Sequence, residues 1–341
     1  MKKFERLSNK RVQPAMKFLL SILLLLLFRN SGAQSTGKPE HSAAVAPVGL
    51  VKQAIAANSD YQLTRRNPSD ADAWLGYYKW VVQTRDLSAN EKLLQQKAAI
   101  AQSAAYIGST WQFSLINFIE SGKRDRSLLK AALNMAADKS MIYPYAIQHA
   151  IITKDATLLH DYALALNEVN PLPAELFEYH QNVLQSAPAN AIIFGKGLTD
   201  LVPMAILQTV FGIRKDIRLG YYEERPADIT NTFICLSAGK EVISNYPRAG
   251  YAGLLVQLEG AQTDPELQQM AARFKLYQLL SQDHFSDIAI HLYSNYLPTF
   301  ILLYKSYKQK NPMEAEKWKA LALKIAGMSG KVEAVHKMLA S

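Results

Sequence analysis

Residues 190–219 constrain the fold more than any other part of the chain, because they combine strand and helix patterns in a sequence patterned mainly for helices. A β-branched apolar run, Ala191–Phe194, leads into the polar glycine loop Gly195–Asp200. A helical run then covers Leu201–Phe211, and a second strand is expected at Asp216–Leu219. This order predicts a βαβ unit. Loops at the carboxyl ends of parallel strands are where α/β folds bind ligands, so the glycine loop is the first candidate site.

Residues 48–188 carry a helical pattern with short breaks and are predicted to form a helical-repeat domain. Asn67-Pro68-Ser69-Asp70 precedes a helix, and Ser88-Ala89-Asn90-Glu91 matches a capping box. One apolar face of the first helix is formed by Trp74, Tyr77, Tyr78 and Val81. Short helix pairs joined by short links are typical of an α-solenoid, in which each pair buries its apolar face against the next.

The remainder divides into a small α/β segment at residues 189–260 and a helical C-terminal segment at residues 261–341. In the first, Ile229–Leu236 fits either a strand or a buried helix, and we expect one or two further strands. In the second, Asp264-Pro265-Glu266 begins a helix, and Asn311-Pro312 begins another that ends near Gly327. The apolar stripe of the first of these helices is Leu267, Met270, Phe274, Tyr277 and Leu280. The whole chain is therefore predicted to be mainly α, a helical-repeat solenoid with a small βαβ insert.

Residues 1–33 have the pattern of a signal peptide. The apolar run Phe18–Phe28 follows Lys17 and is shorter than the ~20 residues of a membrane-spanning helix. Ser31-Gly32-Ala33 supplies the small residues that signal peptidase requires, so cleavage is expected after Ala33. Met16 fits as an alternative start, and an uncleaved membrane anchor is the alternative interpretation of the segment. Residues 34–47 are expected to be a disordered spacer, and the protein is expected to be periplasmic, secreted or associated with the outer membrane.

The basic composition of the chain comes mostly from this leader. Residues 1–33 hold seven Lys or Arg and one Glu, and so account for six of the nine net positive charges. The remainder has no basic stripe with interleaved aromatic residues, which argues against a nucleic-acid partner. The single cysteine, Cys235, excludes an internal disulfide, and no Cys/His zinc spacing is present.

Two stretches resemble known families. Residues 67–74, NPSDADAW, resemble the turn and first helix of tetratricopeptide repeats, and Asn-Pro recurs at 170–171 and 311–312. The second stretch resembles a segment of secreted helical-repeat proteins of Bacteroidetes and of the soluble part of their mannosyltransferase-like membrane proteins. That segment reads F-T-N-G-D-N-D-T-F-P-x-x-x-L-Q followed by G-[IV]-R-x-D-[VI]. The positions that match it here are Phe194, Gly197, Asp200, Pro203, Leu207, Gln208, Gly212, Ile213, Arg214, Asp216 and Ile217.

Departures from the family segment fall in the loop itself. Leu198, Thr199 and Leu201 stand where the segment has Asp, Asn and Thr. The acidic pair of the family segment, which is able in principle to bind a cation or activate water, is thereby reduced to Asp200 alone. The resemblance implies an extracytoplasmic address and a helical-repeat architecture rather than an activity.

The candidate ligand-binding residues lie in and after the glycine loop. They are Lys196, Gly197, Thr199, Asp200, Arg214 and Asp216. In the functional interpretation, backbone amides at the helix start bind an anion and Lys196 adds charge. In the structural interpretation, the glycines form a tight turn, Asp200 or Thr199 caps the helix, and Arg214 pairs with Asp216.

The remaining polar clusters carry less chemical information. His284, Asp287 and His291 share one face if they lie on a helix, but they span ~10 Å, which is wide for one metal ion, and a polar helix face is the alternative. The chain has seventeen tyrosines, which are expected either to pack between helices or to line a groove that binds a glycan or a protein. No catalytic residue and no cofactor is predicted.

These observations favour an extracytoplasmic scaffold without catalysis that binds an envelope protein or a polysaccharide. The alternative is a small-ligand or glycan-processing enzyme centred on Gly195–Asp200. A lipid partner is a third possibility, although no segment after the leader is long and apolar enough to span a membrane.

Overall fold

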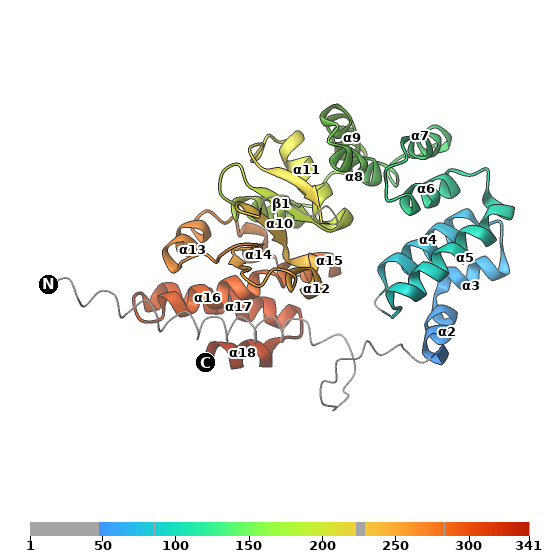
Figure 1. Ribbon diagram of the computed structural model, residues 1–341. Helices are drawn as coiled ribbons and strands as arrows, with labels where there is room; N and C mark the ends of the chain where they lie inside the picture. The colour runs from blue at the N-terminus through green and yellow to red at the C-terminus, as the bar shows by residue number, and fades with distance from the viewer. Residues whose placement is uncertain (1–47, 85, 223–228, 283, 341) are drawn as a thin grey trace. The chain divides into compact units, whose positions relative to one another are not determined.

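The computed structural model describes residues 48–84, 86–222, 229–282 and 284–340, which are mainly helical with one small mixed sheet (Figure 1). Described residues up to 170 form one compact unit and those from 171 form another; we call them the N-terminal and C-terminal units. The predicted leader and spacer lie outside the described residues. Among the helices that are described, none combines the length and hydrophobicity needed to cross a bilayer.

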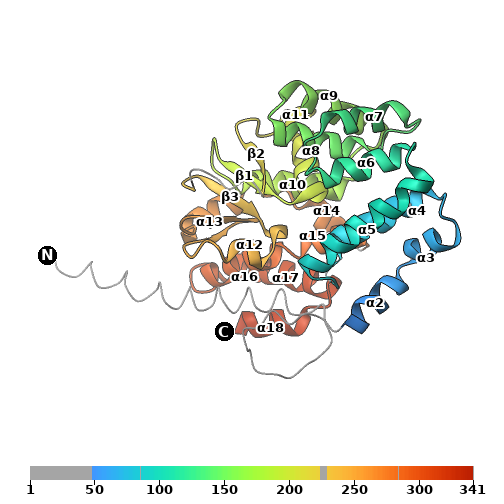
Figure 2. The ribbon, with the colours of Figure 1, turned by 45° about the vertical axis from the view of Figure 1, so that its right-hand side comes forward.

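The N-terminal unit consists of helices that pack mainly on their neighbours in sequence. Its helices are α2 (Val48–Ala57), α3 (Ser59–Arg66), α4 (Ala71–Gln83), α5 (Ala89–Ile107), α6 (Trp111–Glu120), α7 (Arg126–Met135), α8 (Tyr143–Thr153) and α9 (Ala156–Val169). The largest contacts join α4 to α5, α6 to α7 and α8 to α9. Figure 2 shows α4 and α5 lying side by side.

Side-chain caps define where these helices begin. Asp70 accepts the Ala73 N–H at the start of α4, and Ser88 and Glu91 form the predicted capping box at the start of α5. The predicted apolar face of α4 is buried, and the Tyr78 hydroxyl on that face donates to Glu120 of α6 at 2.6 Å. The sequence therefore predicted both the caps and the core face of this helix.

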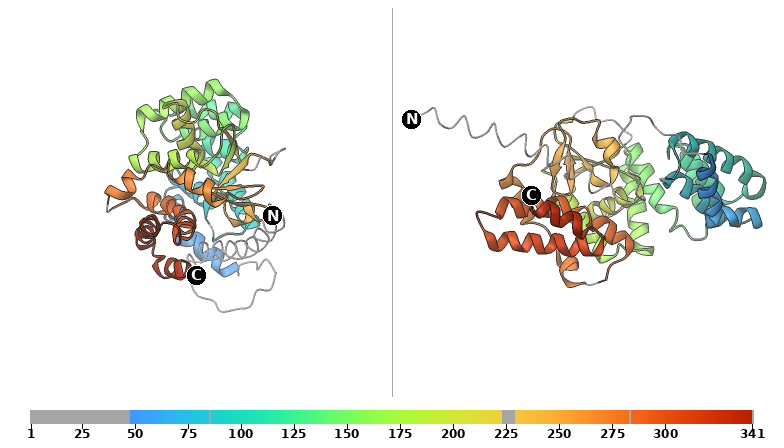
Figure 3. Two further views of the ribbon diagram at one scale, coloured as in Figure 1. Left: turned by 90° about the vertical axis from the view of Figure 1, so that its left-hand side faces the viewer. Right: turned by 90° about the horizontal axis from the view of Figure 1, so that it is seen from below.

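The C-terminal unit surrounds a five-stranded sheet with helices. Its strands are β1 (Ile192–Gly195), β2 (Arg218–Tyr221), β3 (Thr232–Cys235), β4 (Gly250–Ala252) and β5 (Leu255–Gln257). Its helices are α10 (Ala174–Gln185), α11 (Leu201–Thr209), α12 (Lys240–Ile243), α13 (Asp264–Ala271), α14 (Tyr277–Ser281), α15 (Asp287–Tyr293), α16 (Tyr296–Tyr307), α17 (Pro312–Met328) and α18 (Val332–Ala340). The 3-10 turns are η1 (Gly197–Thr199) and η2 (Leu236–Ala238). Figure 3 shows α16, α17 and α18 gathered on one side of the strands.

The sheet confirms the predicted βαβ unit. Its strand order is β2-β1-β3-β5-β4, and β1 pairs in parallel with both β2 and β3. The second strand begins at Arg218, two residues later than predicted. The ambiguous run at residues 229–236 contains a strand, β3, and the antiparallel hairpin β4–β5 makes three further strands where one or two were expected.

The turn of the β4–β5 hairpin is fixed by two helices. Gly253 has φ +61°, and a Cβ atom there would lie 2.2 Å from the Met270 sulfur, so this position requires glycine. The Gly253 carbonyl accepts from Thr299 of α16 at 2.6 Å, and the next N–H, of Leu254, donates to Ser186 at 3.1 Å. Two buried hydroxyls thus anchor the hairpin to the helices.

The single helix predicted from Asp264 is wrong, because the chain breaks between α13 and α14. The Asn182 side chain of α10 accepts the Lys275 N–H at 2.7 Å and donates to the Lys275 carbonyl. The Glu178 carboxylate, one turn earlier, accepts the N–H groups of Gln278 and Leu279. These buried contacts replace helical hydrogen bonds, and Tyr277 is left 72% exposed instead of lying on the predicted apolar stripe.

The last predicted helix end is also wrong in position. α17 buries Trp318 and Leu321, as expected, but it continues through Gly327 to Met328. The residue with the left-handed conformation is Gly330, at φ +65°. α10 packs on α11, α14 and α15 and belongs to the C-terminal unit.

Replacing Asn182 with Ala is expected to destabilise the C-terminal unit by about 3 kcal/mol, because the Lys275 N–H and C=O and the buried Tyr296 hydroxyl all lose their hydrogen bonds to the Asn182 side chain. Urea denaturation followed by circular dichroism measures the change. Gln181→Ala, on the neighbouring half-buried residue of the same helix, is the control and is expected to stay within about 0.5 kcal/mol of the wild type. Equal losses in the two variants would contradict the role given to Asn182.

Candidate functional site

The glycine loop connects the carboxyl end of β1 to the start of α11. A Cβ atom on Gly195 would lie 2.9 Å from side-chain atoms of Asp200 and Leu201, so the loop closes tightly only with glycine there. Gly197 has φ +71° and begins the 3-10 turn η1. The loop therefore returns Asp200 to the end of β1.

Asp200 is the buried acidic group of this loop. The residue is only 4% exposed. Its Oδ2 atom accepts a hydrogen bond from the Lys196 N–H at 2.8 Å and another from the Ser237 hydroxyl. Asp200 stands at the N-cap position of α11 but makes no side-chain cap, so the expected capping role is not what its carboxylate does. The carboxylate instead ties the loop after β1 to the loop after β3.

Ser237 was missed at the sequence level. It lies in η2, 37 residues after Asp200, within a stretch whose secondary structure the pattern left open. Only the parallel pairing of β1 with β3 brings the two residues together. The sequence could have indicated that Ser237 lies near Asp200 only through the rule that the carboxyl ends of parallel strands meet at one edge of a sheet. Applying that rule requires knowing that β1 and β3 are neighbours.

Burial raises the pKa of Asp200 to about 6, and the hydrogen bonds from Ser237 and Lys196 oppose the rise only in part. The Cys235 thiol is fully buried nearby, and burial together with the Asp200 charge raises its pKa well above the usual value. Cys235 is therefore a protonated core residue and not a nucleophile at neutral pH.

His180 of α10 holds the loop from the other side. Its Nδ1 lies 2.8 Å from the Leu176 carbonyl oxygen and its Nε2 lies 2.7 Å from the Thr199 carbonyl oxygen. Burial lowers the pKa of His180 to about 4, which favours the neutral ring. A neutral ring has one N–H, so it donates to one of these carbonyls at a time.

The other predicted loop residues are on the surface. Lys196 and Thr199 are exposed, and Gly197 and Leu198 are half-buried. The Lys196 ammonium lies 5.7 Å from the centre of the Tyr222 ring, which follows β2. Their role as ligand-binding residues stays a prediction.

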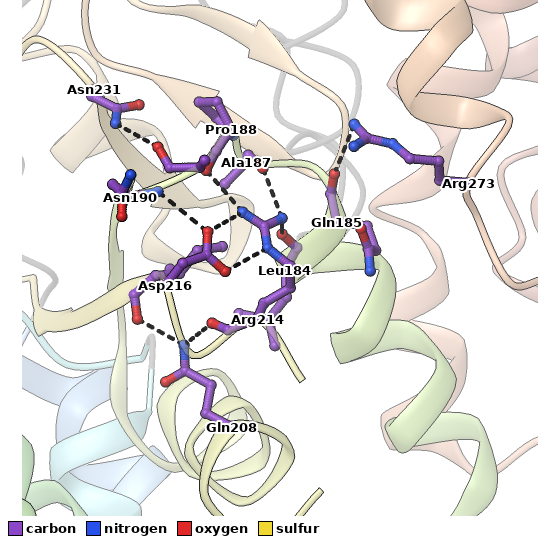
Figure 4. Close-up of polar contacts among 12 residues, drawn as sticks. Leu184, Gln185, Ala187, Pro188, Asn190, Gln208, Arg214, Asp216, Asn231 and Arg273 are labelled. Atoms are coloured by element: carbon purple, nitrogen blue, oxygen red, sulfur yellow. Dashed lines mark hydrogen bonds and ion pairs between the residues drawn. The ribbon is translucent and has the colours of Figure 1, made fainter. Parts of the chain in front are cut away.

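Arg214 and Asp216 form the predicted ion pair, within a larger clamp (Figure 4). Arg214 Nε and Nη2 donate to the two Asp216 carboxylate oxygens, each at 2.8 Å. The other guanidinium bonds go to the carbonyls of Leu184, Ala187 and Pro188 at 2.8–2.9 Å. All five N–H donors of the guanidinium are used, so Arg214 has none left for a ligand.

Two further residues, Asn190 and Gln208, complete the clamp. Asp216 Oδ2 accepts the Asn190 N–H at 3.2 Å, and the hydrogen bonds from Arg214 lower the pKa of Asp216 to about 2. Gln208 of α11 donates to the carbonyls of Arg214 and Ile217 at 2.8 and 2.7 Å (Figure 4). Arg214, Asp216 and Gln208 thus join the end of α10, α11 and the start of β2.

His284, Asp287 and His291, which the sequence offered only as a weak metal candidate, do not lie on one helix. α15 begins at Asp287, with Ser286 as its N-cap, so His284 precedes the helix and the spacing argument for a shared face is wrong. Within the described ranges, no group of three His, Cys, Asp or Glu residues is placed to hold a metal ion.

Comparison of the chain with protein-family models, with curated proteins and with solved structures gave no match.

Replacing Asp200 with Asn is expected to make stability less dependent on pH. The raised carboxyl pKa means that the folded state holds its proton more tightly than the unfolded state, so wild-type stability falls as pH rises from about 4 to 6. Two pKa units correspond to about 3 kcal/mol. Denaturation at several pH values should therefore show Asp200→Asn gaining on the wild type towards neutral pH. A constant difference between the two proteins would contradict a raised pKa.

Replacing Arg214 with Lys is expected to cost at least about 2 kcal/mol of unfolding free energy, because an ammonium group cannot reproduce the five directed bonds. The matched control is Arg218→Lys, on an exposed arginine of β2. Urea denaturation should show a loss for the first variant and almost none for the second. If Arg214→Lys is as stable as the wild type, the clamp is not a stabilising element.

Proposed function

We propose that this chain is an extracytoplasmic helical-repeat scaffold that binds a protein partner through its N-terminal unit, without catalysis. The observation that carries the proposal is an apolar stripe on the outer face of α5. The stripe consists of Leu94, Ala98, Ala101 and Ala105. Leu94 is 65% exposed, Ala101 and Ala105 are exposed, and Ala98 is half-buried.

The stripe lies opposite the side by which α5 packs. The buried residues of α5 are Ala99, Ser103 and Ile107, at a spacing of four. At 100° per residue, the stripe is centred roughly 180° from these buried residues on the helix circumference. α5 therefore has one apolar face towards its own unit and a second towards solvent, whereas a surface helix normally has one.

The chemistry of the stripe favours a protein over a polysaccharide. Leu and Ala side chains offer no hydrogen-bonding group to sugar hydroxyls, and the spacing of four, three and four residues matches the seam along which two helices pack. Three of the four residues are alanines, which allow a partner backbone to approach closely. An amphipathic helix of a partner is the element that fits this surface.

Two observations support the rest of the proposal. The capped short helices pack in sequential pairs, which is the local arrangement of repeat proteins such as tetratricopeptide proteins. The leader pattern in residues 1–33 supports export to the periplasm, the cell surface or the medium.

Replacing Ala101 with Arg is expected to abolish partner binding without changing the fold, because arginine is a good helix former but blocks close packing on the stripe. Ala104→Arg is the matched control, since Ala104 is an exposed alanine of the same helix about 90° from the stripe. Affinity capture from cell-envelope extract with the full chain and both variants compares them. A partner retained by Ala104→Arg and lost by Ala101→Arg supports the proposal. A partner retained equally by both variants places binding elsewhere.

A further inference from the structure

α5 exposes more large apolar side chains than any other described helix. They are Leu93, Leu94 and Tyr106, whose exposed fractions are 46%, 65% and 57%. Single apolar side chains scattered over a surface are normal, but several on one helix mark a surface for another protein. The outer face of α5 is therefore the first candidate for an interface.

The first half of α5 gains little from packing within its own unit. Its residues Ala89–Ala98 are all described, and none of them is buried. The Tyr77 hydroxyl of α4 donates to Gln95 Oε1 at 3.1 Å, which is a polar contact of this half. The buried residues of the helix lie in its second half, and they are Ala99, Ser103 and Ile107. Because helices owe most of their stability to a packed apolar face, the first half lacks cover for Leu93 and Leu94.

The stripe on α5 is complementary to an antiparallel copy of itself. A second α5 running in the opposite direction places its Ala105 opposite Leu94 and its Ala101 opposite Ala98. Each layer then contains at least one alanine, so the two helix axes can lie close together, about 8 Å apart, along the whole stripe. A parallel copy would place Leu94 against Leu94 at one end and alanine against alanine elsewhere, which would hold the axes apart at that end and leave gaps at the other.

The antiparallel arrangement also gives each copy the cover that it lacks. The first half of one α5 lies on the second half of the other, which is held in place by its own buried residues. The contact is the same for both copies, as a two-fold axis requires. Lys97 is the only charged residue between Leu93 and Tyr106, so closing the interface removes little charge from water.

We propose that two copies of this chain associate through α5 as an antiparallel helix pair, with Leu94 of each copy packed on Ala105 of the other. This dimer rests on the proposed function, since it takes the α5 stripe as the binding surface and names a second copy as the partner. The stripe runs about 16 Å along one helix. An interface of this size is small, so we expect a weak dimer with a Kd of roughly 10–100 µM.

Sedimentation velocity of the purified full chain, from about 1 to 200 µM, tests for the dimer, and we expect monomer at the low end and mostly dimer at the high end. Ala101→Arg puts a long charged side chain in a central layer and should weaken dimerisation at least about tenfold. Ala104→Arg, on the exposed alanine beside the stripe, is the matched control and should dimerise as the wild type does. A chain that is monomeric at every concentration, or association that Ala101→Arg leaves unchanged, overturns the proposal.

Disulfide cross-linking tests the direction of the two helices. The chain's own Cys235 is buried and protonated, so it does not interfere. A mixture of Leu94→Cys and Ala105→Cys should give a linked dimer on a non-reducing gel, because the two substituted positions face each other. Leu94→Cys alone should give none, because its two copies lie about 16 Å apart along the helix axis. Linkage of Leu94→Cys to itself, or none in the mixture, overturns the antiparallel pair.

Measurements on the purified chain and on envelope extract separate this dimer from the proposed function. If the chain stays monomeric while Ala101→Arg loses a captured envelope protein, the second copy is not the partner and the scaffold function stands. If the chain dimerises through α5 while both arginine variants retain an envelope protein equally, the dimer stands and that protein binds elsewhere.

Discussion

The polar side chains of α10 are the constraint on which the C-terminal unit depends. Glu178 and Asn182 satisfy backbone groups between α13 and α14, and Ser186 accepts an N–H of the β4–β5 hairpin. His180 contacts the loop after β1, and the carbonyls at the end of the helix accept from Arg214. Buried polar groups are costly unless each finds a partner, so these contacts specify one arrangement of sheet and helices where apolar packing alone would allow several.

Local signals in the sequence predicted the local structure well. Caps at Asp70 and Ser88, the core face of α4 and the first strand–loop–helix unit all depend on residues close together in the chain, and all are present in the structure. The Arg214–Asp216 pair was predictable for the same reason, since its members lie two positions apart in the chain. The three carbonyls that complete the clamp were not, because they come from the end of a helix about 30 residues earlier.

Long-range contacts account for the failures. The apolar stripe from Leu267 to Leu280 has a helical period, yet Asn182, 93 residues earlier, supplies hydrogen bonds that favour a break at Lys275. Asp200 looked like a helix cap because of its position before Leu201, and Ser237 and the Lys196 N–H took its carboxylate instead. In both cases a hydrogen bond to a residue far away in the sequence replaced the local one that the pattern predicted. The periodicity of the sequence does not reveal such long-range hydrogen bonds.

The contacts of α10 also determine when the C-terminal unit can form during synthesis. Glu178 and Asn182 meet their partners about 100 residues later, and Thr299, which holds the hairpin turn, lies later still. Until that part of the chain has been made, the Glu178 and Asn182 side chains of α10 lack their hydrogen-bond partners. A fragment of the unit that ends earlier is therefore expected to have little stability. Contacts so distant in sequence slow folding. The C-terminal unit is therefore expected to complete its fold only after the chain has been made as far as Thr299.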